Sequence, residues 1–191
     1  IAGFYPIGWS DDGQLFAFRS VARNSVYEPD DEIVIRDIIN DRDLEHIRLK
    51  NEYHQEAYEL TDPYLDQVLK KYRIIPGYNL IPETRYKNPY DGYIYSFYAE
   101  ADEACYEFDS RDEGNIRIWA TINQPDTKSK RINTIGFEGV VLYDLYIHGL
   151  IISPVESRVI LMVITDEYGF EGDHDYRYEL YGCRLRLNDF R

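Results

Sequence analysis

The 191-residue sequence predicts a mainly β fold, with antiparallel sheets in a propeller-blade-like or sandwich arrangement and one amphipathic helix. Three observations support this prediction. Apolar and polar residues alternate in short segments, turn-forming residues separate those segments, and only one stretch has apolar residues at helical spacing. We expect a single domain over 1–191, which could contain two blade-like units, at about 1–50 and 140–191, around a helix and Tyr-rich strands.

The first fifty residues have the pattern of about four strands. Residues 10–13 form a turn, because Ser and Asp side chains hydrogen-bond nearby backbone amides and Gly accepts positive φ. After this turn Phe16 and Phe18 recur at the period of a strand, so both rings are expected to face a core. A segment rich in β-branched residues, 32–39, is the next strand, and 40–43 is the turn that ends it.

Residues 63–72 are expected to form the helix. Asp62 is placed to cap its N-terminus, and Pro63 is favourable at the first helical position because its missing N–H has no helical partner there. One apolar stripe follows at helical spacing, made by Leu65, Val68, Leu69 and Tyr72.

From residue 86 onward the pattern is β again, after a connection broken by Pro76, Gly77 and Pro82. The sequence predicts a turn at 88–92, a loop at 124–130, and strands at 93–100, 105–108, 116–122, 131–135 and 140–148. The final part, 152–161, repeats the opening order of strand, Ser-led turn and apolar strand.

The turn Trp9-Ser10-Asp11-Asp12-Gly13 resembles the W-S-x-D-G turn of Tol-associated and tryptophan-aspartate repeat propellers, which implies a blade-like unit at this end. A second resemblance, to a group of uncharacterised bacterial exported proteins, spans most of the chain. It is carried by turn and helix motifs: Pro6-Ile7-Gly8-Trp9-Ser10-x-Asp12-Gly13, Val68-Leu69-Lys70-Lys71-Tyr72-Arg73-Ile74, Ser153-Pro154, Arg158-Val159, Gly169-Phe170-Glu171-Gly172 and Gly182-Cys183. This resemblance implies export to the periplasm or cell envelope, without an assigned activity.

Cys105 and Cys183 are the two cysteines of the chain. Their number alone fits either one disulfide in an oxidising compartment or two thiols in a reducing one. The export that the resemblance implies favours a disulfide between them.

Acidic residues outnumber basic residues, 35 to 21, which gives a formal net charge of −14. Because Lys and Arg contacts to phosphate supply most non-specific affinity for nucleic acid, a nucleic-acid partner is not expected. No apolar run reaches the roughly 18 to 20 residues that a membrane-spanning helix needs.

The strongest candidate for a metal site is an acidic segment near the C-terminal end. It contains Asp166, Glu167, Glu171, Asp173, His174 and Asp175, of which Asp166, Glu171, Asp173 and Asp175 are the predicted ligands. Carboxylates on a loop can bind Ca²⁺, although the spacing is not that of an EF-hand. The four histidines show no zinc-ligand spacing, and no other cofactor is predicted.

The nineteen tyrosines are the most unusual feature of the composition. Tyr90, Tyr93 and Tyr95 are the predicted ligand-binding residues, because Tyr presents apolar area with a polar tip and is common at binding surfaces. The alternative is that these rings cover sheet faces, where aromatic residues are favoured in any case.

Catalytic motifs are not found, and no catalytic residue is predicted. Gly8-Trp9-Ser10 is not a G-x-S-x-G turn, since Asp12 stands where the second Gly belongs, and acidic neighbours disfavour a thiolate at Cys105. The leading hypothesis is therefore a non-enzymatic exported envelope protein that binds a protein or glycan partner through a Tyr-rich sheet surface. The alternative is a hydrolase or metal-dependent enzyme that uses the acidic 166–175 loop.

Overall fold

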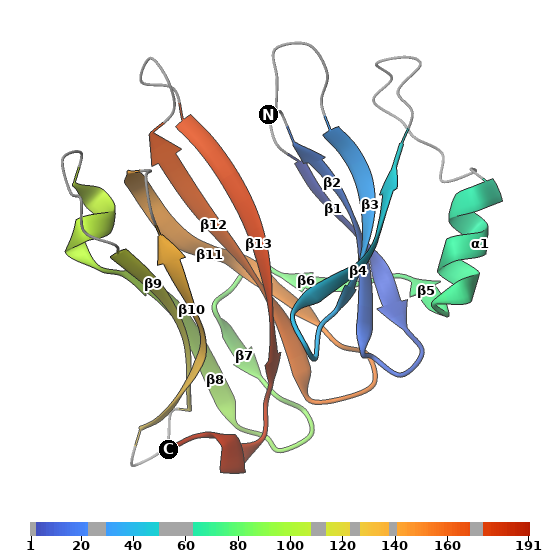
Figure 1. The fold of residues 1–191 in the computed structure, drawn as a ribbon. Helices are drawn as coiled ribbons and strands as arrows, with labels where there is room; N and C mark the ends of the chain where they lie inside the picture. The colour runs from blue at the N-terminus through green and yellow to red at the C-terminus, as the bar shows by residue number, and fades with distance from the viewer. Residues whose placement is uncertain are drawn as a thin grey trace. The chain divides into compact units, whose positions relative to one another are not determined.

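The computed structural model describes residues 3–22, 30–49, 63–107, 114–122, 127–137, 141–168 and 174–191. It confirms the mainly β fold, with three antiparallel sheets, and the described residues include one α-helix (Figure 1). The chain divides into two compact units. One comprises Ile1–Asn79 and Ser153–Glu156, and the other comprises Leu80–Ile152 and Ser157–Arg191.

The first unit contains a five-stranded sheet with the strand order β4-β3-β2-β1-β5. Four of these strands, β1 to β4, are consecutive in the chain and adjacent in the sheet, and they correspond to the four strands that the sequence predicts. The bounds are β1 Gly3–Ser10, β2 Leu15–Ala22, β3 Asp30–Asp37, β4 Arg42–Arg48 and β5 Ile74–Pro76.

The helix α1, Pro63–Lys71, lies where the apolar stripe predicts it. Leu65, Val68 and Leu69 are buried, and they share a core cluster with Ala17 and Ile33 of the sheet. The predicted cap Asp62 lies outside the described residues. Lys70 and Lys71 in the last turn stabilise the helix, because their positive charges lie near the negative end of the helix dipole.

The turn between β1 and β2 is formed as the sequence predicts. The hydroxyl of the buried Ser10 donates to Asp12 Oδ1 at 2.7 Å and accepts from the backbone N–H of Leu15 at 2.9 Å. The hydrogen bond from Ser10 holds the pKa of the Asp12 carboxyl below its usual value. Gly13 has a φ of 70°, a conformation that favours glycine. Phe16 is buried beyond the turn, as expected.

The second unit has two four-stranded antiparallel sheets, in the orders β10-β9-β8-β7 and β13-β12-β11-β6. The bounds are β6 Asn79–Ile81, β7 Arg85–Lys87, β8 Ile94–Ala101, β9 Gly114–Ile122, β10 Lys128–Phe137, β11 Leu142–Ile152, β12 Arg158–Tyr168 and β13 His174–Arg184. Side chains from both sheets meet in one core cluster, which includes Tyr95, Ile118, Leu150, Leu161 and Tyr181. The unit is therefore a sandwich.

Two predicted elements of this unit were wrong. The expected strand at 105–108 is a 3₁₀ helix, η1 (Glu103–Tyr106), in its described part, because the Cys105 N–H donates to the Asp102 carbonyl and closes a turn. Residues 128–130, expected in a loop, already belong to β10, since Lys128 pairs with Ile122.

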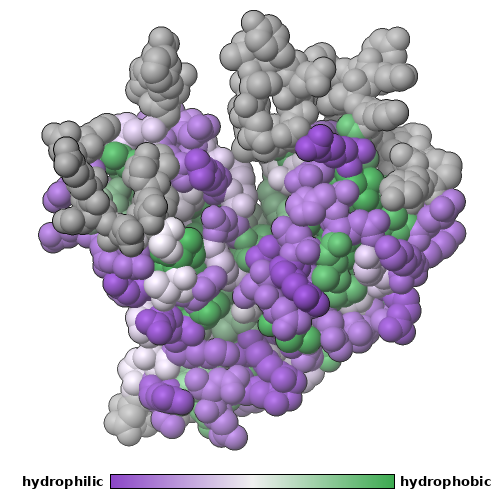
Figure 2. All heavy atoms as spheres, viewed as in Figure 1, coloured by the Kyte–Doolittle hydropathy of each residue, from purple (hydrophilic) through white to green (hydrophobic). Residues whose placement is uncertain are grey.

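Hydrophilic residues cover most of the surface that Figure 2 shows, and hydrophobic residues appear in small areas between them. Among the helices of the described residues, none is long and apolar enough to cross a lipid bilayer.

Candidate functional site: an aromatic cluster beside a buried aspartate

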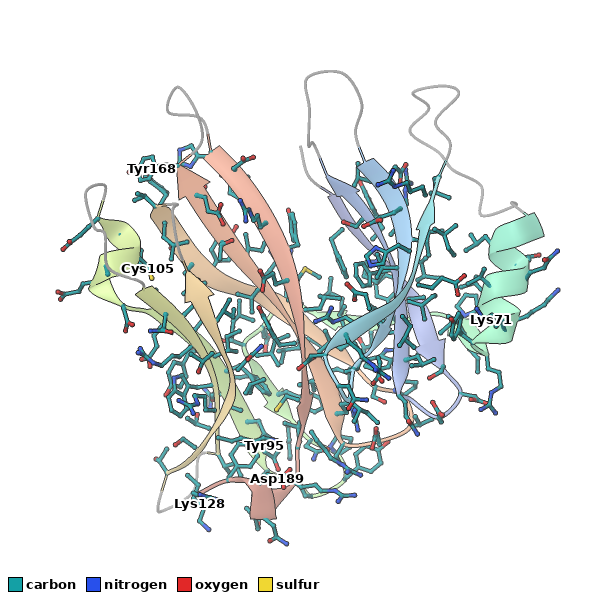
Figure 3. All side chains as sticks on the ribbon, viewed as in Figure 1. Lys71, Tyr95, Cys105, Lys128, Tyr168 and Asp189 are labelled. Atoms are coloured by element: carbon teal, nitrogen blue, oxygen red, sulfur yellow. The ribbon has the colours of Figure 1, made fainter. Side chains whose placement is uncertain are left out.

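The three tyrosines predicted to bind a ligand do not form a common surface. Tyr90 is 58% exposed, whereas Tyr93 packs partly against the core and Tyr95 is fully buried inside the sandwich (Figure 3). The Tyr95 hydroxyl donates to Asp91 Oδ2 at 2.7 Å, so this side chain supports the turn before β8. Burial raises the pKa of the Tyr95 phenol above its usual value. The predicted role of Tyr95 in ligand contact is therefore corrected to a role in the core.

The acidic segment is divided by the alternation of side chains along the strands. Asp166 and His174 lie on one face of the β12–β13 pair, whereas Glu167 and Asp175, which are direct cross-strand partners, lie on the other. Two of the predicted ligands, Glu171 and Asp173, lie outside the described residues. The described ligands Asp166 and Asp175 do not converge, and no three metal-ligating side chains do so within the described parts of the chain.

Four aromatic rings gather around Asp166 at the end of β12. We call this group, Tyr143, Tyr168, His174 and Tyr176 with the Asp166 carboxylate, the His174 cluster. Tyr143 packs edge-on against His174 at 4.6 Å and against Tyr168 at 5.4 Å between ring centroids. His174 is nearly parallel to Tyr176 at 6.2 Å. Figure 3 shows Tyr168 at this end of the strand.

Strand register brings these side chains together. Tyr168 is the cross-strand partner of His174, and Asp166 is the partner of Tyr176, so all four share one face of the sheet. The third strand contributes Tyr143 through a register shift between Leu142 and Asp144, which leaves Tyr143 as the extra residue of a bulge. Bulges commonly redirect a side chain at a functional site.

The hydrogen bond between Asp166 and His174 fixes the orientation of the imidazole. His174 Nδ1 lies 2.9 Å from Asp166 Oδ1 and 3.0 Å from Oδ2. Because a carboxylate only accepts, we assign the Nδ1 proton to this hydrogen bond, and Nε2 is left facing away from the carboxylate. The Asp166 side chain is buried and His174 is partly exposed, so the imidazole ring is accessible to solvent and the carboxylate lies beneath it.

Negatively charged side chains lie next to the rings of the His174 cluster. Tyr143 and Tyr176 are 54% and 45% exposed, and Asp144 is exposed beside them. Burial, together with nearby phenols and the carboxylates of Asp144 and Asp166, raises the pKa of Tyr146 in the adjoining row. Exposed aromatic faces over carboxylates favour a positively charged group.

The predicted disulfide is not formed. Cys105 and Cys183 are separate buried thiols. Cys105 packs with Ile116 and Leu142, whereas Cys183 belongs to the main core cluster of the sandwich. Burial raises the pKa of the Cys105 thiol, which disfavours the reactive thiolate.

Sequence reasoning included Asp166 and His174 in the acidic segment but missed the rings around them. One signal was present in the sequence: His174, Tyr176 and Tyr178 recur at every second residue, the period at which side chains share a strand face. Comparisons with protein-family models, curated proteins and solved structures found no match to this chain.

Proposed function

We propose that this protein is a non-enzymatic binding protein whose β11–β13 surface captures a basic segment of a protein partner. The observation that carries the proposal is the His174 cluster, in which exposed aromatic rings lie together over a buried carboxylate. The ligand group would be a guanidinium or ammonium from an Arg or Lys side chain.

A cation fits this surface for two physical reasons. The face of an aromatic ring attracts a cation through its quadrupole, by about 0.5–1 kcal/mol at an exposed site and more where water is excluded. The carboxylates of Asp144 and Asp166 add a second attraction, and the net charge of −14 steers basic partners toward the protein at a distance. Arg suits the surface better than Lys, because its planar guanidinium stacks on aromatic rings.

Export to the cell envelope stays a prediction that rests on sequence resemblance. The separation of the two thiols removes the support that a disulfide would have given to an oxidising compartment.

The test is the binding of a fluorescent nine-residue peptide in which Arg alternates with Ser, followed by anisotropy. A peptide with citrulline in place of Arg controls for charge, because it keeps the shape and loses the cation. We expect Tyr143→Ala and Tyr176→Ala each to weaken binding of the Arg peptide by about two- to fivefold, the range of one exposed cation–π contact. Added salt should weaken binding further.

Tyr90→Ala is the matched control, since Tyr90 is as exposed as Tyr143 but lies outside the cluster. It should bind the Arg peptide like the unaltered protein. Equal binding of the Arg and citrulline peptides would contradict the proposal, as would equal losses in the Tyr143 and Tyr90 variants, because both results would leave the cluster without a specific role.

A second candidate function is hydrolysis with His174 as the base. The orientation of His174 by the Asp166 carboxylate favours it, because a carboxylate that holds Nδ1 leaves Nε2 ready to accept a proton. This candidate predicts turnover of an activated ester, such as p-nitrophenyl acetate, that His174→Asn abolishes. The binding proposal predicts no turnover above the rate of free imidazole.

A further inference from the structure

The outer face of the other sheet in the second unit carries a separate aromatic pair. In β9, residues alternate between buried and half-buried, so Ile118 and Ala120 face the core while Trp119 faces outward. Tyr98 of β8 is the direct cross-strand partner of Trp119 and is 43% exposed. The two rings lie nearly parallel, with an interplanar angle of 15° and centroids 6.4 Å apart. They form an aromatic platform on the sheet.

The indole of this platform is held in place. Trp119 Nε1 donates to Glu100 Oε1 at 2.9 Å, and Glu100 follows Tyr98 by two residues on the same face of β8. A ring fixed by a hydrogen bond loses little freedom when a ligand stacks on it. The carboxylate of Glu100 still has lone pairs that can accept hydrogen bonds from a ligand.

One cation lies directly beside the platform and two more lie further along the same face of the sheet, although the whole chain is strongly acidic. Arg131 is the partner of Trp119 on β10, while Arg85 and Lys87 lie on the outward side of β7. Among the residues that the structure describes, no carboxylate forms a salt bridge with these three side chains. By contrast, Arg117 on the same face is neutralised by Asp102, with an Nη1 to Oδ1 distance of 2.6 Å.

We infer that this face binds a saccharide that carries a carboxylate, such as a uronic acid. A pyranose ring has an apolar face of C–H groups that can stack on Tyr98 and Trp119, and hydroxyls around its rim that need both donors and acceptors. Glu100 supplies an acceptor, and the Thr121 hydroxyl, which donates to the Ser96 carbonyl at 3.3 Å, leaves its oxygen as a second acceptor next to the platform. The Arg131 guanidinium matches the sugar carboxylate, because it can donate two parallel N–H bonds to its oxygens.

Single-stranded nucleic acid also stacks on aromatic rings and pairs with Arg. The acidic saccharide is the better match because Glu100 on β8 and Arg131 on β10 lie on opposite sides of Trp119, so a sugar can place a hydroxyl at Glu100 and its carboxylate at Arg131. A small ligand interacts mainly with the charges of this face and little with the net negative charge of the whole chain, because charges beyond about 8 Å are screened at physiological salt.

Tryptophan fluorescence gives a direct readout, since the chain has two tryptophans and Trp9 is only 2% exposed. The probe is an oligogalacturonate of about five residues, and its methyl-esterified form is the neutral control. We expect the acid form to change the emission of Trp119 and to bind at least tenfold more tightly than the ester, the value of one hydrogen bond to a charged group.

Arg131→Gln should remove this tenfold preference and leave the affinity for the ester unchanged. Arg186→Gln, which removes the same charge from an exposed position elsewhere, should keep the preference. Tyr98→Ala should weaken both forms, and unchanged thermal melting would show that the variants are folded.

Three results would overturn the inference: equal affinity for acid and ester, equal effects of the two Arg variants, or tighter binding of a dT12 oligonucleotide than of the acidic saccharide. Because the Arg peptide binds at the His174 cluster under the proposed function, the two proposals fail independently.

Discussion

Gly114 is the position at which one added methyl group should have the clearest effect on stability. It is buried at the start of β9, and an added Cβ would lie 2.3 Å from Cys105 Sγ and 3.2 Å from the Cys105 backbone nitrogen. Cys105 is itself buried, so its sulfur has little room to move. Gly136, on the neighbouring strand β10, is the matched control, because a Cβ there meets no atom within 4 Å.

Overpacking a core costs about 1–3 kcal/mol in the free energy of unfolding. Replacing Gly by Ala in a strand returns about 0.5–1 kcal/mol, because the unfolded chain loses conformational freedom. We therefore expect Gly114→Ala to destabilise the protein by about 1–2 kcal/mol and Gly136→Ala to stabilise it by about 0.5–1 kcal/mol. With a urea m-value near 2 kcal/mol/M, the two midpoints should differ by about 1 M.

Urea unfolding followed by tryptophan fluorescence measures both variants, and a double-mutant cycle with Cys105→Ala tests the cause. Removing the sulfur takes away the nearest clash. The double variant should then be more stable than the sum of the single effects by about 1 kcal/mol or more. Equal midpoints for the Gly114 and Gly136 variants, or strict additivity in the cycle, would refute the reasoning.

Three further predictions concern buried polar groups. Burial raises the pKa of Glu167, so as pH falls the folded chain binds a proton at this carboxyl at a higher pH than the unfolded chain does. The free energy of unfolding should therefore increase as pH falls from neutral toward 4.5. Glu167→Gln should remove that part of the pH dependence in denaturation curves, and an unchanged curve would contradict it. Ser10→Ala should cost about 1–3 kcal/mol in urea unfolding, because it leaves the Leu15 N–H without its partner; a loss below 0.5 kcal/mol, within the usual range for an exposed site, would argue against this. Thiol titration of denatured, unreduced protein should find two thiols, from Cys105 and Cys183, whereas none would show a disulfide.

Much of the fold follows from periodicity in the sequence. The helix stripe of Leu65, Val68 and Leu69 and the alternation along β9 each belong to a long, regular pattern, and both elements lie where these patterns predict them. The strand expected at 105–108 had no such pattern, and a short-range turn at Asp102 outweighs the β preference of its residues. Local contacts of this kind leave little trace in composition.

The candidate site was predicted only in part, because period two shows which side chains share a face but not which face is buried. Tyr95 lies toward the sandwich core, whereas Tyr98, three residues later, lies outside with Trp119. In the same way, the acidic segment contained both Asp166 and Asp175, which strand pairing places on opposite faces. Tyr143 joins the His174 cluster through a bulge, which depends on pairing with another strand.

Two buried carboxylates at the end of β12, Asp166 and Glu167, lie on opposite faces of the sheet, and this arrangement restricts the register in which β13 can pair with β12. Asp166 pairs with His174 on one face, and Glu167 pairs with Arg177 at 3.0 Å on the other. A slip of β13 by one residue would move every one of its side chains to the opposite face and separate both pairs. Leaving a buried carboxylate without its hydrogen-bond partner costs about 1–3 kcal/mol. The two pairs therefore favour the native register of β12 and β13 as the hairpin forms, and they destabilise registers that are shifted by one residue.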